Sequence, residues 1–270
     1  LVAGCSGGLH VPSDGVIDEP RAAREQARRA AGRGAVFRWG HRVTRLLTRA
    51  GAVTGVRTDR GDIAADRVVC AAGVATPEIC DTAGIRVPVL PMPAMLLTSG
   101  PDAGGAPRDP VLWHEESGLA VWTTAGGAAG VSTVPGDDRW AVACGLYPGL
   151  RDLPPPNSRI VPSARTAGDF PLLGETTAVR GLWLAASVWA VHSVGAAQLL
   201  TEWMLDGEPS LTLFECSLNR FIDVQRDPEY TRSRTSGTFV RTHGVVSPVK
   251  DDTDTSALRV SPFYPRQREL

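Results

Sequence analysis

The stretch RGLWLAASVWAVHSVGAAQLLTEWMLDG (Arg180–Gly207) decides the fold of this 270-residue chain. LWLAAS (Leu182–Ser187) has the length and apolarity of a strand, and AAQLLTEWMLDG (Ala196–Gly207) places apolar side chains on one face at helical spacing. Gly207 is a good C-terminal cap for that helix. The loop between the two elements, VWAVHSVG, contains a glycine. A strand–loop–helix unit of this kind presents backbone N–H groups to a ligand where the helix begins.

The first 83 residues show a second buried run. RVVCAAG (Arg67–Gly73) is continuously apolar, which indicates a strand buried on both faces, as in a parallel sheet. The strand-like runs AVFRWGHRVTRLLT (Ala35–Thr48) and GAVTGVRTD (Gly51–Asp59) precede it, and DRGD (Asp59–Asp62) predicts a hairpin turn into DIAADRVVCAAG. PRAAREQARRAAGRG (Pro20–Gly34) predicts a helix, because proline suits a first turn and alanine favours helix.

The middle of the chain has a different pattern. Residues 84–156 are rich in proline and glycine, with the short strand-like pieces VLPMPAMLLTS, PVLWHEESGLAVWTT, GVSTV and WAVACGLY. We therefore expect an α/β (α+β) chain with a mostly antiparallel sheet, 84–156, inserted into a doubly wound domain. That domain would comprise residues 1–83 and 157–207, and the polar residues 208–270 would form a connector of a helix or two plus extended chain.

Charge and composition narrow the class of protein. A hydrophobic content of 43%, a charged content of 21% and a net charge of −1 are typical of a globular protein, and exclude a general attraction to nucleic acid or to an anionic membrane. No apolar run has the length of a membrane span, and the first residues lack signal-peptide features. The cysteines have no zinc or disulfide spacing, so we expect no metal site and free thiols in a reducing, cytoplasmic compartment. They are Cys5, Cys70, Cys80, Cys144 and Cys216.

Three stretches together resemble the D-amino-acid-oxidase-like family of FAD-dependent oxidoreductases. They are GLHVPSDGVIDEP (Gly8–Pro20), the pair HRVTRL and GVRTDRGDIAADRVVCAAG (within 41–73), and DFPLLGE together with RGLWLAASVWAVHSVGAAQLLTEWMLDG (within 169–207). Within the family, VWAVHS (Val188–Ser193) and LRVSPF (Leu258–Phe263) look like the dimethylglycine oxidase and sarcosine dehydrogenase branch. Residues 213–234 look like the connector of that branch.

The resemblance implies a chemistry. Its cofactor is FAD, its substrate is a small N-methylated glycine-type amine such as dimethylglycine or sarcosine, and hydride moves from the methyl carbon to the flavin. It also implies a folate-binding domain as a partner in the full-length protein, which would receive the one-carbon unit. The sequence does not name the amine, because such substrates differ by a single methyl group.

The resemblance further implies site residues. The backbone of Val43 would meet the adenine of FAD, Ala72 and Gly73 would let the cofactor approach closely, and the loop at 188–193 would pass beside the flavin ring, where a helix N-terminus stabilises negative charge. The implied cofactor-binding residues are Val43, Ala72, Gly73, Leu173, Val188, Trp189, Ala190, Val191, His192 and Ser193. Each of three residues also has a purely structural interpretation. Val43 would be a valine in the core of a strand, Gly73 would form the turn that ends a strand, and His192 would be a structural histidine.

His114, in PVLWHEES, falls by the same resemblance where the family places an active-site histidine. A neutral imidazole there would orient the substrate amine or keep it unprotonated, because hydride loss needs the nitrogen lone pair. The alternative is a strand-edge histidine whose pKa is raised by Glu115 and Glu116. The sequence leaves both open.

One element of the family is missing. No strand–GxGxxG–helix is present to hold the FAD pyrophosphate, and GCSGG (Gly4–Gly8) does not replace it. The chain opens on Leu1, so we expect a fragment that lacks the FAD-anchoring segment and the folate-binding domain, and that binds FAD weakly or not at all by itself. The alternative function is a non-catalytic remnant or interaction module. A nicotinamide-dependent dehydrogenase finds no support without a dinucleotide fingerprint.

Overall fold

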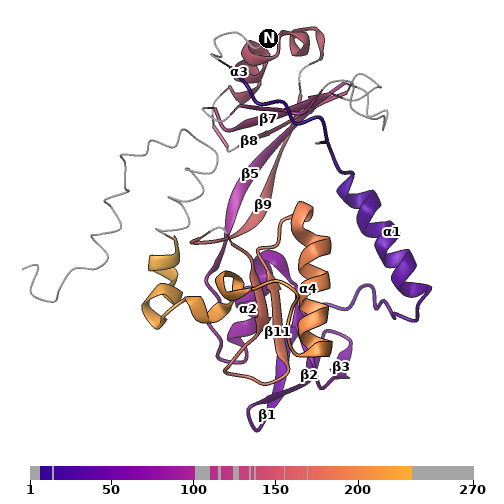
Figure 1. The fold of residues 1–270 in the computed structure, drawn as a ribbon, viewed down its shortest axis with the longest axis vertical. Helices are drawn as coiled ribbons and strands as arrows, with labels where there is room; N and C mark the ends of the chain where they lie inside the picture. The colour runs from indigo at the N-terminus through magenta and orange to yellow at the C-terminus, as the bar shows by residue number, and fades with distance from the viewer. Residues whose placement is uncertain are drawn as a thin grey trace, which may run out of the picture. The chain divides into compact units, whose positions relative to one another are not determined.

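The computed structural model describes residues 7–13, 15–100, 110–114, 117–123, 128–133, 135–136, 138–154, 156–168 and 170–232. They fall into two compact units (Figure 1). The first unit comprises residues 1–37, 93–162 and 240–246, and the second comprises residues 38–92, 163–239 and 247–270, each as far as it is described. None of the helices in the described ranges has the length and hydropathy of a membrane-spanning helix.

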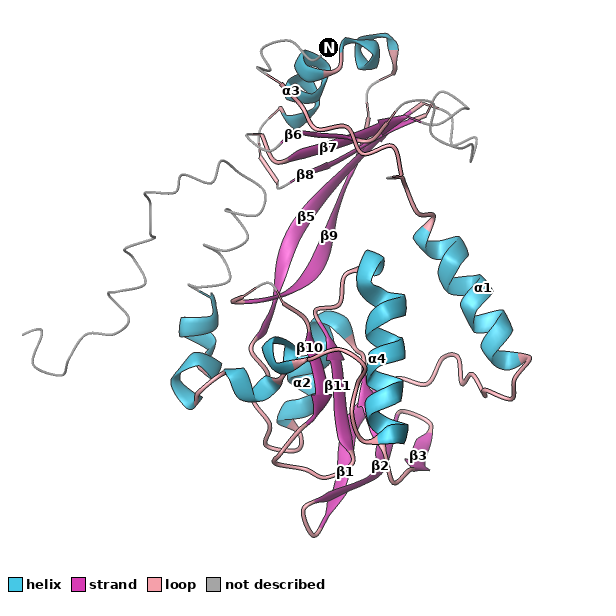
Figure 2. Cartoon of the chain, in the orientation of Figure 1, coloured by secondary structure: helices cyan, strands magenta, loops and turns pink. Residues whose placement is uncertain are grey.

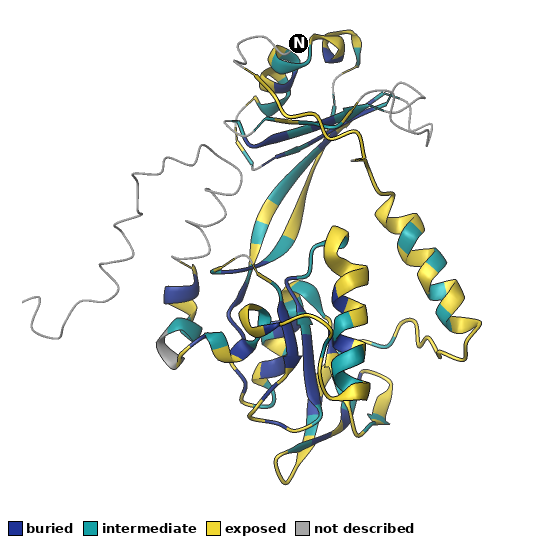
Figure 3. Ribbon diagram, in the orientation of Figure 1, coloured by how far each residue is buried: buried dark blue, intermediate teal, exposed yellow. Residues whose placement is uncertain are grey.

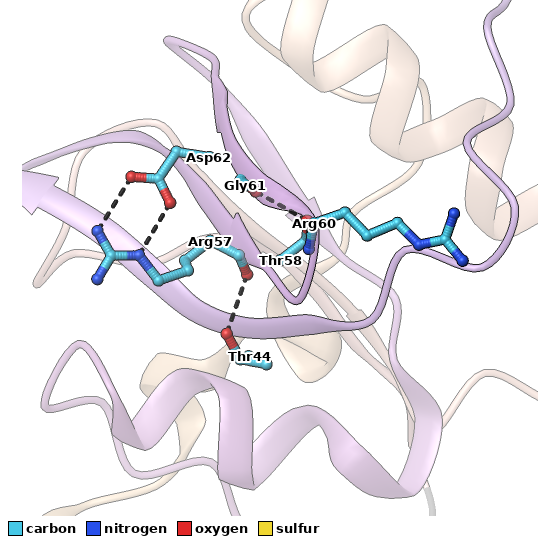
Figure 4. A network of polar contacts seen from close by, with 6 residues as sticks. All are labelled: Thr44, Arg57, Thr58, Arg60, Gly61 and Asp62. Carbon is cyan, nitrogen blue, oxygen red and sulfur yellow. Dashed lines mark hydrogen bonds and ion pairs between the residues drawn. The ribbon is translucent and has the colours of Figure 1, made fainter.

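The second unit begins with a three-stranded antiparallel sheet of β1 (Val43–Arg49), β2 (Ala52–Thr58) and β3 (Gly61–Ala64), in that order. The hairpin predicted between the second and third strands is confirmed. The Arg57 guanidinium donates to both carboxylate oxygens of Asp62, at 2.8 and 3.0 Å (Figure 4). This cross-strand pair lies next to the turn and reinforces the register of the hairpin.

The strand predicted over residues 35–48 is wrong in its first half. The strand starts only at Val43, because Trp39 and Gly40 form a turn immediately before it. The later run DIAADRVVCAAG also splits in two: its first part forms β3, and its second part forms β4 (Val68–Cys70), which belongs to another sheet.

A second three-stranded sheet has the order β10 (Leu172–Glu175), β11 (Leu182–Ala186), β4. Figure 2 labels β10 and β11 of this sheet. β11 runs parallel to β4, and β10 runs antiparallel to β11. The predicted parallel strand is therefore confirmed. The prediction that it is buried on both faces is wrong: Cys70 is 5% exposed but its neighbour Val69 is 40% exposed, so described residues cover one face of β4.

Helix α4 (Ser193–Asp206) covers this sheet and ends at Gly207, as predicted. Ala196 and Leu200 are its buried residues, and Trp203 packs edge-on against Trp183 of β11, with ring centroids 5.7 Å apart. The short helix α2 (Thr76–Asp81) follows the 3₁₀ turn η1 (Gly73–Ala75) after β4. The core of the second unit joins β1, β2, β4, α2, β10 and β11 in one apolar cluster.

The first unit contains the helix α1 (Glu19–Ala31), which confirms the helix predicted there. Asp18 caps it by accepting a hydrogen bond from a first-turn backbone N–H at 2.9 Å. The guanidinium groups of Arg28 and Arg29 bind the Glu25 carboxylate at 2.8 Å and lower its pKa to about 2. No residue of α1 is buried (Figure 3).

A five-stranded sheet has the order β6 (Leu112–His114), β7 (Leu119–Thr123), β8 (Ala129–Thr133), β5 (Val89–Ser99), β9 (Asn157–Thr166). The pairs β6–β7, β7–β8 and β5–β8 are antiparallel, so the predicted antiparallel sheet, and with it the mixed α/β fold class, is confirmed. β5 and β9 contribute residues to both units.

One strand prediction in the first unit is wrong. WAVACGLY forms the helix α3 (Arg139–Leu146), not a strand. Asp138 explains the difference, because its carboxylate accepts a hydrogen bond from Ala141 N at 3.3 Å and caps the helix. The fully buried residues Ala143 and, after it, Leu150 of η2 (Pro148–Asp152) then join the core of the sheet.

The predicted connector begins with three short 3₁₀ turns, η4 (Phe214–Cys216), η5 (Leu218–Arg220) and η6 (Asp223–Arg226). Leu218 and Phe221 are buried in the core of the second unit. This part of the predicted connector therefore packs against the second unit. The LRVSPF element at 258–263 lies outside the described residues.

The contact between β10 and α4 gives a stability prediction. Gly174 has a φ of +119°, and a Cβ added there would lie 2.5 Å from Cζ3 of Trp203. Gly174→Ala should therefore lower the free energy of unfolding by about 2 kcal/mol, through overpacking and backbone strain. Thermal unfolding followed by circular dichroism measures the loss.

Gly195→Ala is the matched control, because a Cβ at this helical position meets nothing within 4 Å. It should leave the unfolding midpoint unchanged or raise it. Equal losses for the two variants would contradict the steric account.

Candidate cofactor site

The site lies at one edge of the sheet that contains the parallel pair. Leu182 faces Val68 and Leu184 faces Cys70, so β4 and β11 end at the same edge. The chain leaves β4 through Ala72 and leaves β11 through Ser187. In open α/β sheets, ligands bind in the crevice outside the carboxyl ends of parallel strands. This pairing brings two of the predicted groups, at 72–73 and 188–193, to a common edge.

A hollow of about 660 Å³ adjoins this edge. Val43 at the start of β1 and Ala72 after β4 both line it, together with the apolar side chains of Val56 and Ile79. Its volume is within the range of small-molecule sites. Arg42, Arg67 and Glu78 supply its charged groups. Apolar walls with two guanidinium groups suit a flat aromatic ring that carries negative phosphate, which is the chemistry of the adenosine half of FAD.

The loop after β11 has a strained start. Ser187 is 3% exposed and has a φ of +55°, a left-handed conformation that is uncommon for a residue with a side chain. Its Oγ donates a hydrogen bond to the carbonyl oxygen of Ala164 at 2.9 Å. Strained backbone of this kind persists only where the surrounding structure holds it, and it is concentrated at functional sites.

The loop continues through the 3₁₀ turn η3 (Ala190–His192) into α4. No side chain caps the start of α4. Val191 and Val194 are 69% and 62% exposed, so no described residue covers this helix N-terminus. A helix start that is open and carries partial positive charge suits an electron-rich group of a ligand.

A buried cation beside this loop was not predicted from the sequence. Arg165 is 6% exposed, and its guanidinium carbon lies 4.1 Å from the ring centroid of Trp189. Its Nε donates to Ser163 Oγ at 3.2 Å. The Trp189 ring in turn stacks on His192, with centroids 6.0 Å apart. The three side chains form a continuous stack, which fixes the indole through a cation–π contact.

The other predicted cofactor residues differ in their exposure. Leu173 is 3% exposed and packs with Ala196 and Leu213 beneath α4, and Val188 packs against the same cluster. The buried Leu173 side chain therefore supports the helix and leaves only its backbone available to a ligand, whereas Val188 is partly exposed. Gly73 begins η1 with a φ of +56°, which a glycine adopts without strain.

His114 is the last residue of β6, in the first unit, whereas the predicted cofactor residues lie in the second unit. Its Nδ1 lies 2.8 Å from Ser117 Oγ and accepts a hydrogen bond from Ser117 N at 3.2 Å. A backbone N–H directed at Nδ1 makes that nitrogen the acceptor and leaves Nε2 as the ring nitrogen that can face a ligand. Arg139 donates to the carbonyl oxygen of Ser117 at 3.2 Å and holds this turn. Glu115 and Glu116 lie outside the described residues.

The comparison with protein families identifies the class. The model of FAD dependent oxidoreductases matches residues 1–203, and the model of the FAD dependent oxidoreductase central domain matches residues 206–261. The fold is thus that of a flavin-dependent oxidoreductase. The chain belongs to the DAO family of FAD-dependent oxidoreductases.

Several curated proteins are similar to the chain. The 4-methylaminobutanoate oxidase (formaldehyde-forming) of Paenarthrobacter nicotinovorans is 27% identical over 99% of the chain and 36% of that protein. The D-amino acid dehydrogenase of Paramagnetospirillum magneticum is 30% identical over 80% of the chain and 54% of that protein. The mitochondrial dimethylglycine dehydrogenase of Mus musculus is 26% identical over 79% of the chain and 29% of that protein. The chain thus spans between 29% and 54% of these relatives.

Solved structures share the fold. The L-proline dehydrogenase from P. horikoshii superposes with a TM-score of 0.69 at 21% identity, covering 78% of the chain and 61% of that structure. The glycine oxidase from Geobacillus kaustophilus superposes with a TM-score of 0.65 at 20% identity, covering 78% of the chain and 60% of that structure.

The conformation of Ser187 gives a prediction for the site. Ser187→Ala and Ser187→Gly both lose the hydrogen bond to Ala164, at a cost of about 1 kcal/mol. Only glycine also relieves the left-handed strain, which is worth about 1 kcal/mol. We therefore expect Ser187→Ala to lower the denaturant midpoint clearly and Ser187→Gly to lower it little. Equal midpoints for the two variants would show that the backbone there stores no strain.

Proposed function

We propose that this protein oxidises a small N-methylated amino acid of the dimethylglycine or sarcosine type, with FAD as the hydride acceptor. The single observation that carries the proposal is the joint position of Ala72 and the Val188–Ser193 loop at the carboxyl edge of β4 and β11. The family membership supports FAD as the cofactor. The loop sequence VWAVHS supports the dimethylglycine oxidase and sarcosine dehydrogenase branch within the family.

The activities for which the relatives are named support the substrate class. They act on 4-methylaminobutanoate, D-amino acids and dimethylglycine, which all carry an amine and a carboxylate. Two of the three carry an N-methyl group. We therefore favour an N-methylated substrate. Oxidation of a D-amino acid instead would change the substrate class but keep the family.

Each part of the chain would have its own role. Residues 1–83 and 157–207 would form the FAD-binding part, 84–156 the substrate-binding sheet, and 208–270 a connector toward a folate-binding domain. When bound, FAD supplies the two-electron acceptor. The backbone at Val43, Ala72 and Gly73 would accommodate the adenine half of FAD, and the open N-terminus of α4 would stabilise negative charge on the ring half.

His114 would act on the substrate amine. Its Nδ1 is engaged by Ser117, which leaves Nε2 to orient the amine, and the amine must be unprotonated to release hydride. Arg165 would act through Trp189, by holding the indole beside the start of α4.

The decisive experiment uses the full polypeptide that carries this chain, purified and examined by visible spectroscopy. Bound flavin, with absorption bands near about 370 and 450 nm, is expected, and bleaching by dimethylglycine or sarcosine under anaerobic conditions tests the substrate. Bleaching by D-amino acids alone would overturn the substrate class. The absence of any bound flavin would favour the non-catalytic alternative.

Substitution of His114 tests its assigned role. His114→Gln should lower kcat/KM about 100-fold, within the usual range for general acid–base groups. His10→Gln is the matched control, because His10 is exposed and outside the proposed site. Unchanged kcat/KM in His114→Gln would assign this histidine to the structure of the strand edge.

Filling the hollow tests the cofactor assignment. Ala72→Leu would occupy part of the space next to Val43, and we expect it to weaken FAD binding about tenfold, or about 1.4 kcal/mol. Ala64→Leu, on the exposed strand β3 and outside the hollow, is the control. Fluorescence titration with FAD measures both, and equal dissociation constants would place the adenine elsewhere.

A further inference from the structure

An arginine of the predicted connector binds the chain between β9 and β10. Arg220 ends η5, and its Nη1 donates a hydrogen bond to the carbonyl oxygen of Pro171 at 3.0 Å. Its Nη2 donates to the carbonyl oxygen of Phe170 at 2.9 Å and to Thr166 Oγ1 at 3.4 Å. Thr166 Oγ1 itself donates to the Phe170 carbonyl oxygen at 2.7 Å. Acceptors from both ends of the β9–β10 connection, residues 167–171, thus converge on one guanidinium.

The surroundings of Arg220 make these contacts hard to release. The guanidinium is half-buried, and no carboxylate in the described part of the chain forms an ion pair with it. Burial lowers its pKa to about 10, so it still carries its charge at neutral pH. The carbonyl oxygens and the ring of Phe221, whose centroid lies 4.5 Å from the guanidinium carbon, therefore replace lost hydration. A charge that depends on these groups holds them in place in turn.

The end of β9 links this arginine to the candidate cofactor site. Thr166, which Arg220 contacts, is fully buried and follows Arg165 directly in the strand. On the other side of Arg165, the carbonyl oxygen of Ala164 accepts the hydrogen bond from Ser187 Oγ at 2.9 Å. The backbone that carries Arg165 is therefore held from two sides, by the loop after β11 and by Arg220.

The indole of Trp189 depends on Arg165 for its orientation. Its Nε1 is buried and has no hydrogen-bond partner among the described residues. Ring contacts orient it instead, with the Arg165 guanidinium carbon 4.1 Å from its centroid and the His192 ring stacked at 6.0 Å. A displaced Arg165 would remove one of these two contacts, and the indole beside the start of α4 would lose its fixed position.

We propose that Arg220 is a positioning residue of the candidate cofactor site. It fixes the β9–β10 connection, keeps Arg165 in place and thereby sets the orientation of the Trp189 indole. Lysine cannot replace it, because one ammonium group does not reproduce the planar fork that serves several acceptors. The effect on FAD rests on the proposed function, whereas the chain of contacts from Arg220 to Trp189 does not.

Hydroxyl-radical footprinting of the full polypeptide tests this chain of contacts, with mass spectrometry to locate the oxidised tryptophans. Arg220→Gln should raise the oxidation rate of Trp189 at least about threefold, because the loop around the indole opens locally. Trp183 and Trp203, which pack edge-on against each other, should keep their natural rates. An unchanged rate at Trp189 would overturn the proposal.

Arg226→Gln is the matched control. Arg226 ends η6 of the same connector, and its guanidinium also donates to two backbone carbonyl oxygens, those of Phe221 and Leu218, at 3.1 and 3.3 Å. This variant loses similar hydrogen bonds without touching the β9–β10 connection, so Trp189 should keep its natural oxidation rate. An equal rise in both variants would assign the effect of Arg220 to general loosening and overturn the proposal.

Thr166→Val decides the case in which Arg220→Gln unfolds, which faster oxidation of the buried Trp183 would reveal. It removes only the hydroxyl that Arg220 and Phe170 share, and it keeps the shape of the side chain. We expect Trp189 to oxidise about twofold faster, the effect of losing one hydrogen bond. No change at Trp189 in this variant would again overturn the proposal.

Titration with FAD separates this inference from the proposed function. Arg220→Gln should raise the dissociation constant of FAD about tenfold, because a misplaced group weakens the site it serves. Arg226→Gln should leave the constant unchanged. Faster oxidation of Trp189 with unchanged FAD binding would overturn the role in the cofactor site. If the natural protein binds no flavin, the proposed function fails, while the footprint still decides whether Arg220 holds Trp189.

Discussion

The parallel pairing of β4 with β11 is the constraint on which the rest of the second unit depends. It joins two segments more than a hundred residues apart, with Leu182 opposite Val68 and Leu184 opposite Cys70. Because parallel strands end at the same edge, this one register brings the turn at Gly73 next to the loop that begins at Ser187. Apolar side chains from both strands then pack against α2, β1 and β2.

The candidate site at that edge has a buried, well-packed base and an uncovered helix start. Beneath it, Leu173 and Ala196 are buried and fix α4 on the sheet. Above it, the start of the helix is uncapped and its valines are exposed. Arg165 adds a buried positive charge whose contact with Trp189 holds the loop from the side. A rigid base with an uncovered polar helix end is the arrangement that a ring-shaped cofactor with developing negative charge needs.

Much of this arrangement could be predicted from the sequence, because strong periodic signals specified β11, α4 and the hairpin at Asp59–Asp62. The failures have local causes. A single capping residue, Asp138, turned an apolar run of strand type into α3. β9 is polar over most of its length, so no alternation revealed it, and Arg165 was missed with it. Which strands pair, and therefore which residues share the 660 Å³ hollow, is decided by long-range packing that a local pattern does not contain.

The helix α1 buries none of its residues against the described part of the chain. Its 13 residues are near the lower limit of length for an isolated helix in water, and none of them is buried. Its helical content is therefore a local helix–coil equilibrium, set by the cap at Asp18, by alanine content and by the ion pairs of Glu25 with Arg28 and Arg29. Such an equilibrium responds gradually to temperature and ionic strength. The amide protons of α1 should exchange with solvent without any opening of the β-sheet core, so the chain carries two separate scales of stability.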